Sequence, residues 1–247
     1  MHTKSNITIC IPTNFVPSSP GTSLVEYTIN NLFAKVPELK ECPLVISCDV
    51  HPEKNGEAEH EYVRNLEKLA STQVRVISAE SNQGQRTSFL NLAANVETKY
   101  MLNFEHDWVF AEHIPFDQLL DVMEKYEDVN FIAFNKTRNF VRGTDYVLEP
   151  ATDITEIPLL RSARYSNNPH LSRKSFWDVK LRKILSDPKP LSGNLNFAIE
   201  VPVFGAYRRD IGRRGFAAAH KDWGIFVYGE MEHPPTIKHV NGKKFKG

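Results

Sequence analysis

Hydrophobic positions in the first 135 residues alternate between short apolar runs and longer amphipathic stretches. Short β-rich runs predict buried strands, whereas apolar residues spaced three and four apart predict helices that cover a sheet. The predicted strands cover residues 7–11, 44–48, 74–79, 100–104 and 131–134. The predicted helices cover residues 23–34, 57–70, 85–96 and 116–126. This alternation predicts an α/β fold with a doubly wound, mostly parallel sheet flanked by helices.

The pattern is less regular after residue 134. Residues 136–168 are rich in charged residues, Thr and Pro, with only weak strand signals, and such a stretch is often a functional loop. The later segments predict an amphipathic helix, a turn, an apolar run around Glu200, a basic helix, a last strand and a basic tail, at residues 172–185, 187–193, 195–204, 206–214, 223–228 and 237–247. We therefore expect one domain with two halves, residues 1–135 and 136–247.

Composition narrows the class of protein. A hydrophobic content of 41%, a charged content of 24% and a net charge of zero are typical of a soluble globular protein and give no reason to expect nucleic acid as the main partner. Cys10, Cys42 and Cys48 lie in or beside apolar runs and lack C-x-x-C spacing, which predicts reduced thiols in the core. No apolar run is long enough to span a membrane, and no signal peptide is evident, so we expect a cytoplasmic protein. The oligomeric state stays open.

Acidic residues follow several of the predicted strands. Asp49 ends the second strand, and Glu105 and Asp107 follow the fourth. Ligands of a parallel sheet bind at the carboxyl ends of its strands, so these side chains are expected in one crevice with the turn at residues 78–84. In an extended chain, positions two apart project to the same side, and two adjacent carboxylates favour a bound cation. A solvated strand end with ordinary acidic residues is the alternative.

A longer pattern surrounds these acids. The run Asn82-Gln-Gly84, then a helix, then Glu97-Thr-Lys-Tyr-Met-Leu-Asn-Phe-Glu105-His-Asp107, resembles the nucleotide-binding half of family 2 glycosyltransferases of the GT-A fold. The opening Ile-Cys-Ile-Pro-Thr13 is similar to that family's first strand and its Pro-containing loop. Two departures are evident: Ser-Phe-Leu replaces the usual Ala-Arg-Asn in the helix, and Glu-His-Asp replaces Asp-x-Asp. The resemblance covers about the first 135 residues well.

The resemblance implies a metal-dependent glycosyltransferase of the hexosyl or deoxyhexosyl type. Such an enzyme moves a sugar from a nucleotide diphosphate sugar to a hydroxyl of a glycan or glycoconjugate acceptor, and the family implies inversion. Residues 1–135 would bind the nucleotide sugar, and residues 136–247 would bind the acceptor and supply the catalytic base. Hard carboxylate oxygens suit Mn²⁺ or Mg²⁺ as the cofactor.

The same resemblance suggests roles for individual residues. Asp107 is the expected metal ligand, and Glu105 is expected to face the nucleotide ribose or a metal-bound water, with His106 as a packing or polar residue. A late His-x-x-Gly segment makes His239 a second metal ligand, and a disordered basic tail is the alternative. The expected nucleotide and diphosphate contacts are Pro12, Thr13, Asp49, Asn82, Gly84 and Arg86. For Asp49 a turn-capping role, and for Asn82 and Gly84 a plain turn, remain open.

The expected catalytic base is Glu200, with Asp222 and Asp153 as alternatives. A lone carboxylate inside an apolar run is expected to have a raised pKa, which suits proton transfer. A buried salt bridge from Glu200 to Arg208 or Arg209 is the structural alternative.

Two other function classes remain. A nucleotidyltransferase could use a similar sheet, but residues 12–20 after the first strand contain no Lys or Arg, where those enzymes carry a basic signature. A non-catalytic sugar- or protein-binding module could share the same fold. Arg138, Arg142, Arg161 and Arg164 flank the irregular region and would suit a sugar or phosphorylated acceptor, without individual roles.

Overall fold

The computed structural model describes residues 6–51, 56–141, 147–186 and 199–240. The strands in these ranges are β1 (Ile7–Asn14), β2 (Leu44–Asp49), β3 (Val74–Ser78), β4 (Tyr100–Asn103), β5 (Trp108–Phe110), β6 (Phe131–Ala133), β7 (Leu148–Pro150), β8 (Leu159–Ser162), β9 (His170–Arg173), β10 (Ile225–Tyr228) and β11 (Ile237–His239). The helices are α2 (Ser23–Lys35), α3 (Glu57–Glu67), α4 (Gly84–Ala94), α5 (Phe116–Lys125), α6 (Lys174–Phe176), α7 (Arg182–Leu185), α8 (Glu200–Arg214) and α9 (Phe216–Trp223), with a 3₁₀ turn η1 (Pro37–Leu39) and a π-helical turn η2 (Trp177–Leu181).

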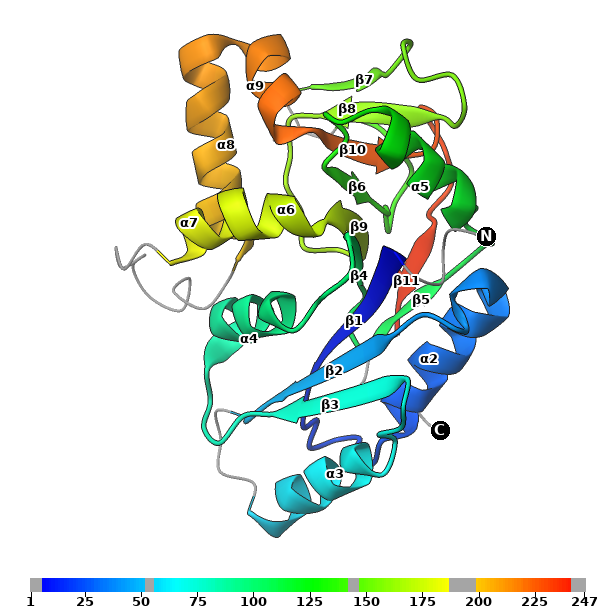
Figure 1. Cartoon of the computed structure of the whole chain (residues 1–247), viewed down its shortest axis with the longest axis vertical. Coiled ribbons are helices and arrows are strands. Elements are labelled where there is room, and N and C mark those ends of the chain that lie inside the picture. Colours follow the sequence, from blue (N-terminus) through cyan, green and yellow to red (C-terminus); the bar gives the residue numbers. More distant parts are fainter. Residues whose placement is uncertain (1–5, 52–55, 142–146, 187–198, 241–247) are drawn as a thin grey trace.

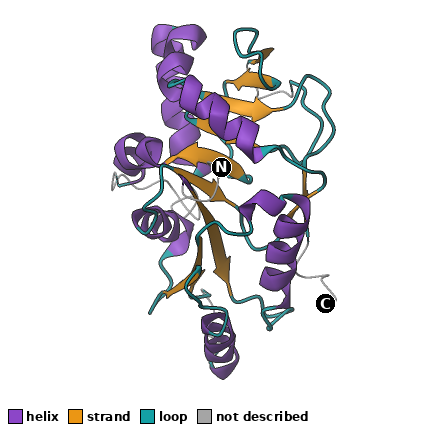
Figure 2. Cartoon of the chain, turned by 45° about the vertical axis from the view of Figure 1, so that its right-hand side comes forward, coloured by secondary structure: helices purple, strands orange, loops and turns teal. Residues whose placement is uncertain are grey.

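A nine-stranded sheet forms the centre of the fold, in the order β3-β2-β1-β4-β9-β6-β10-β8-β7 (Figure 1). β1 pairs in parallel with β2 and β4, β2 with β3, and β6 with β10. β9 lies between β4 and β6 and is antiparallel to both, and β8 is antiparallel to β10 and β7. Helices cover both faces (Figure 2). The predicted α/β fold with a doubly wound, mostly parallel sheet is confirmed.

The core has two layers because alternate residues of a strand point to opposite faces of the sheet. Ile7, Ile9 and Ile11 of β1 are fully buried in the cluster that also contains the apolar faces of α2 and α5. Cys10, from the same strand, belongs to the cluster under α4, α7 and α8. Each buried aliphatic side chain stabilises the fold by about 1.5–3 kcal/mol. Figure 1 shows α2 and α5 on one side of the sheet and α4, α7 and α8 on the other.

The structure corrects three sequence-based expectations in the second half. The helix predicted from residue 172 begins only at Lys174, because Ser172 pairs with both Met101 and Phe131 as part of β9. Residues 136–168 contain the strands β7 and β8, and the predicted basic tail begins with the strand β11. Neighbouring strands decide all three segments by offering backbone partners that the local pattern does not reveal. The turn predicted at residues 187–193 lies outside the described residues.

The cysteines follow the prediction. Cys10, Cys42 and Cys48 are buried free thiols, and burial, with nearby Glu59 and Asp49, raises the pKa of Cys48 to about 12. Among the described helices, none combines the length and the apolarity that a membrane crossing requires. The division of the domain into two halves at residue 135 stays a prediction. β9 from the second half lies between β4 and β6 from the first, so both halves contribute to one sheet.

Candidate functional site

A cavity of about 510 Å³ opens where β1, β2 and β4 end and α4 begins. This is the edge at which parallel sheets bind their ligands. The cavity is lined by six residues that the sequence suggested for the nucleotide sugar: Pro12, Thr13, Asp49, Asn82, Gly84 and Glu105. The chain therefore brings together residues from four separate segments of its first half.

Asp49 organises the turn that leads into α4. Its Oδ1 atom accepts hydrogen bonds from the backbone N–H groups of Val50 and Gln83, each at 2.9 Å. The side-chain amide of Asn82 donates to the Val50 carbonyl, and Gly84 begins α4 with a φ of +72°. A positive φ suits glycine because no Cβ meets the backbone. Asp49 and Asn82 thus have structural roles here, and their contacts to a nucleotide remain predictions.

Thr13 and Arg86, which the sequence also suggested as nucleotide contacts, have hydrogen-bond partners inside the protein. The Thr13 hydroxyl lies 2.7 Å from the Tyr62 hydroxyl, which anchors the end of β1 against α3. The Nε atom of Arg86 donates to the carbonyl of Leu185 in α7. This contact joins α4 to α7, and the predicted contact of Arg86 with a diphosphate stays a prediction.

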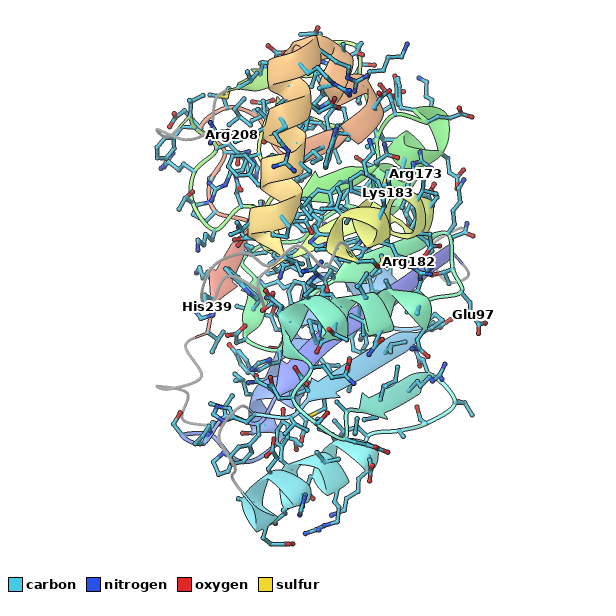
Figure 3. All side chains as sticks on the ribbon, turned by 90° about the vertical axis from the view of Figure 1, so that its left-hand side faces the viewer. Glu97, Arg173, Arg182, Lys183, Arg208 and His239 are labelled. Atoms are coloured by element: carbon cyan, nitrogen blue, oxygen red, sulfur yellow. The ribbon has the colours of Figure 1, made fainter. Side chains whose placement is uncertain are left out.

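Asp107 and His239 meet although they lie 132 residues apart. β11 pairs antiparallel with β5, so that His239 stands opposite Trp108 and packs edge-on against its ring at 4.9 Å. The backbone N–H of Val240 donates to the Asp107 carbonyl at 2.7 Å. In this register the Nε2 atom of His239 lies 2.7 Å from Oδ2 of Asp107. Figure 3 shows His239 at the edge of the face that α4, α7 and α8 cover.

This pair has the chemistry of an incomplete metal site. Oδ1 of Asp107 is buried and has no hydrogen-bond partner among the described residues, which leaves lone pairs for a cation. Carboxylate oxygen and imidazole nitrogen are both ligands of Mn²⁺. The described residues contain no group of three His, Cys, Asp or Glu side chains arranged to hold a metal. A cation held here would therefore complete its coordination with water or with oxygens of a bound ligand.

Glu105 occupies the wall of the cavity beside this pair. The sequence suggested an extended segment, but the N–H of Trp108 donates to the Glu105 carbonyl at 3.1 Å and closes a turn. Burial of the carboxyl, together with the charges of Asp107 and Glu200, raises the pKa of Glu105 to about 8. Its Oε1 accepts a hydrogen bond of 2.7 Å from the side-chain amide of Asn167. Near neutral pH, Glu105 is thus mostly protonated and can donate a hydrogen bond through its other oxygen.

His106, the residue after Glu105, also lines the cavity. Its ring is buried, its Nδ1 is 3.4 Å from the Pro12 carbonyl, and its own carbonyl accepts a hydrogen bond from Thr28. Burial lowers the pKa of the His106 imidazole. His106 therefore joins β1, α2 and the turn after β4 as a neutral side chain.

Glu200 is the first residue of α8, and its side chain is exposed. Its Oε1 accepts hydrogen bonds from the Asn167 backbone N–H at 2.6 Å and from the Ser166 hydroxyl at 3.0 Å. The sequence suggested apolar surroundings or a buried salt bridge, whereas the structure leaves the Glu200 side chain exposed. Glu200 thus stands at the N-terminus of α8, where a negative charge is favoured.

Asp222 and Asp153, the alternatives to Glu200, lie in ion pairs elsewhere. Asp222 pairs with Arg214 at 2.6 Å, and Asp153 pairs with Arg161 at 2.5 Å. Neither is among the described residues that line the cavity. Their geometry gives them no position for accepting a proton from a ligand there.

Asn167 is a site residue that the sequence did not reveal. Its side chain contacts Glu105, 62 residues away, and its backbone contacts Glu200, 33 residues away. It lies in the segment that connects β8 to β9 and links the two carboxylates through hydrogen bonds. No local motif marks it, because Asn167 belongs to a polar run that the pattern assigns only to an irregular region.

Comparisons with known proteins support the fold. No family model matches the sequence, and a comparison with curated proteins found no match. The crystal structure of S. aureus TarS 1–349 matches with a TM-score of 0.52 and 13% identity, covering 95% of this chain and 60% of that one. The structure of GalNAc-T7 with UDP, GalNAc and Mn²⁺ matches with a TM-score of 0.59 and 13% identity, covering 98% of this chain and 45% of that one.

These solved structures are glycosyltransferases, and this chain shares their fold. The fold is the GT-A type that the resemblance implied. The chain spans 60% of the length of the first and 45% of the second. At 13% identity the likeness concerns the fold.

Proposed function

We propose that this protein is a metal-dependent glycosyltransferase that uses a nucleotide diphosphate sugar. The observation that carries the proposal is the Asp107–His239 pair, with a buried carboxylate oxygen left open, beside a cavity at the carboxyl ends of β1, β2 and β4. The shared fold of a glycosyltransferase solved with UDP, GalNAc and Mn²⁺ adds support.

Asp107 and His239 fit a divalent cation. A bound Mn²⁺ or Mg²⁺ would neutralise the negative charge that develops on a departing diphosphate. Asp107 would supply Oδ1, which has no other partner among the described residues, and His239 would supply Nε2 in place of its hydrogen bond to Oδ2. The pairing of β11 with β5 fixes both side chains before a ligand arrives, which reduces the entropy that binding must overcome.

The cavity suits the nucleotide part of the donor. Its wall combines backbone groups at Pro12 and Thr13 with the polar side chains of Asp49 and Asn82. A protonated Glu105 can donate a hydrogen bond to a ribose or phosphate oxygen without adding negative charge beside the diphosphate. Gly84 lets the backbone approach the ligand closely at the start of α4.

Glu200 is the proposed base. In the transfer, the acceptor hydroxyl loses its proton to the Glu200 carboxylate, its oxygen bonds to the anomeric carbon, and the bond from that carbon to the diphosphate breaks. The electron pair of the broken bond leaves with the diphosphate. A single displacement of this kind inverts the anomeric configuration, and the acceptor is a hydroxyl of a glycan or glycoconjugate.

A nucleotide-sugar panel tests the proposal. The protein is incubated with Mn²⁺ and with each common nucleotide sugar in turn, and release of nucleoside diphosphate is measured. Slow release from one donor, lost in Asp107→Ala, is expected. Release of inorganic diphosphate from a sugar phosphate and a nucleoside triphosphate would instead indicate a nucleotidyltransferase. If no nucleotide sugar raises the unfolding temperature with metal present, the transferase proposal fails.

A further inference from the structure

A second cavity, of about 200 Å³, lies between the loop that follows β6 and the loop that follows β8. Lys136, Arg138 and Arg164 line it, together with hydroxyl and amide side chains such as Ser166 and Asn168. Among the lining residues that the structure describes, none carries a carboxylate. The cavity thus places the positive charges of Lys136 and Arg138 beside neutral hydrogen-bonding groups. This composition favours an anion that also carries hydroxyl groups.

Buried contacts hold the first of these loops in place. Asn139 is almost fully buried, and its amide donates to the carbonyls of Tyr228 and Glu230 at 2.8 and 3.1 Å. Its Oδ1 accepts a hydrogen bond of 2.6 Å from Asn135, at the start of the loop. Lys136 and Arg138 therefore extend from a backbone that is fixed without a ligand.

The second loop is fixed from the other side. The hydroxyl of Ser162 accepts a hydrogen bond from the Arg164 N–H at 3.1 Å, and the Ser162 carbonyl accepts one from Tyr207 at 3.0 Å. Tyr165 is buried against Phe131. The backbone that carries Arg164 and Ser166 is therefore also in place before binding. A preformed cationic cavity loses little entropy when it binds an anion.

The position of the cavity connects it with the proposed chemistry. Ser166 lines the cavity and donates to Oε1 of Glu200 at 3.0 Å. On the other side, the Nζ atom of Lys136 lies 5.8 Å from the centre of the Trp108 ring, and that ring packs on His239 at 4.9 Å. The cavity thus lies between the proposed base and the proposed metal pair, where an acceptor would approach.

We propose that this cavity binds an anionic group of the acceptor, a phosphate or a carboxylate, close to the hydroxyl that receives the sugar. The proposal rests on the glycosyltransferase function argued above. It narrows the acceptor to an anionic glycan or glycoconjugate, which Lys136 and Arg138 would hold so that a neighbouring hydroxyl reaches Glu200.

Three matched monosaccharides probe the cavity. Galactose 6-phosphate, galacturonate and galactose share most of their hydroxyl groups and differ in charge. Binding to the full chain is measured by saturation-transfer NMR and by titration calorimetry at low salt. We expect at least one of the two anionic sugars to bind at least tenfold more tightly than galactose. The anionic sugar that binds more tightly identifies the preferred group as phosphate or carboxylate. Equal binding of all three would overturn the proposal.

Two double variants separate this cavity from general surface charge. Lys136→Gln with Arg138→Gln removes two charges from the cavity, and Lys183→Gln with Arg209→Gln removes two from the groove beside α7 and α8 (Figure 3 labels Lys183). The first is expected to weaken binding of the anion at least tenfold, and the second to leave it within twofold. Equal losses in both, or a loss only in the second, would contradict the proposal. Thermal unfolding of each variant excludes a loss caused by misfolding.

A third measurement tests the acceptor proposal separately from the glycosyltransferase function on which it rests. Asp49→Ala alters the first cavity, so it is expected to retain the anionic sugar while its affinity for a nucleoside diphosphate with Mn²⁺ falls. If the wild type binds the anionic sugar but no nucleotide, the glycosyltransferase function fails and the cavity remains only an anion site. If it binds nucleotide and shows no preference for anionic sugars, the function stands and the acceptor proposal fails.

Discussion

Oδ2 of Asp107 lies 2.7 Å from Nε2 of His239, and the antiparallel pairing of β5 with β11 holds the two side chains together. If this pair holds a cation, Asp107→Asn and His239→Ala should each weaken the Mn²⁺-dependent binding of a nucleoside diphosphate by about tenfold or more, which corresponds to about 1.4 kcal/mol. Calorimetric titration with and without Mn²⁺ measures the effect. His113→Ala, which alters an exposed histidine 3.6 Å from Glu38, is the control. A loss of the same size without Mn²⁺ would exclude a metal role.

Replacement of Glu200 should separate catalysis from donor binding. Glu200→Gln keeps an acceptor for the N–H of Asn167 but removes the proton acceptor, so transfer should slow by about 10² to 10⁴-fold. The dissociation constant of the donor should change little, because Glu200 is outside the lining of the first cavity. Rates with saturating donor and acceptor test this. Asp222→Asn, at the alternative acid, should keep full activity, and the opposite pattern would transfer the role to Asp222.

Acid should destabilise the fold through His170. This residue is fully buried, its Nδ1 lies 2.8 Å from the Asn168 carbonyl, and its Nε2 has no partner among the described residues. Burial lowers the pKa of His170 to about 4 from 6.5. Between these values the unfolded chain binds the proton and the folded chain does not, so stability is complete above pH 6.5 and falls as the pH drops toward 4. Across this pH interval the free energy of unfolding falls by about 3 kcal/mol.

Urea unfolding at pH 7.5 and pH 5 checks this effect of His170. His170→Phe abolishes the titration, so the variant should lose less stability than the wild type over that interval. His60→Gln alters an exposed histidine and should follow the wild type. Parallel pH dependence in wild type and His170→Phe would show that another group titrates.

Gly224 should tolerate no side chain. It ends α9 with a φ of +57°, and an added Cβ would lie 1.8 Å from the Asp128 carbonyl oxygen. Gly224→Ala should therefore lower the free energy of unfolding by at least about 2 kcal/mol, because both the backbone strain and the contact must be relieved. Gly212→Ala is the matched control, since nothing lies within 4 Å of its added Cβ, and it should be neutral or stabilise α8 by about 0.5–1 kcal/mol. Urea unfolding of both variants gives the comparison, and equal stabilities would contradict the strain.

Much of the first half could be predicted from the sequence. Residues 7–11 and 44–48 form strands because their apolar, β-rich runs are buried whichever strands flank them. The parallel order that follows places Asp49, Asn82 and Glu105 at one edge, so a shared crevice could be inferred from chain order alone. The direction in which a single side chain points could not be predicted from the sequence. Arg86 stands in the first turn of α4, yet it contacts Leu185 of α7.

The hydrophobic pattern is enough to predict the fold class, most strands and helices of the first half, and the edge at which its polar residues gather, although it misses β5. These features depend on hydrophobic period and on turn residues, which act over a few positions of the chain. The folded chain was needed to show that residues 170–173 form β9 and that Asn167 joins Glu105 to Glu200. The meeting of His239 with Asp107 was expected only from the resemblance, and the pairing of β5 with β11 is what brings it about. Those relationships depend on which distant segment offers backbone partners and burial, and that competition is settled only when the whole chain is packed.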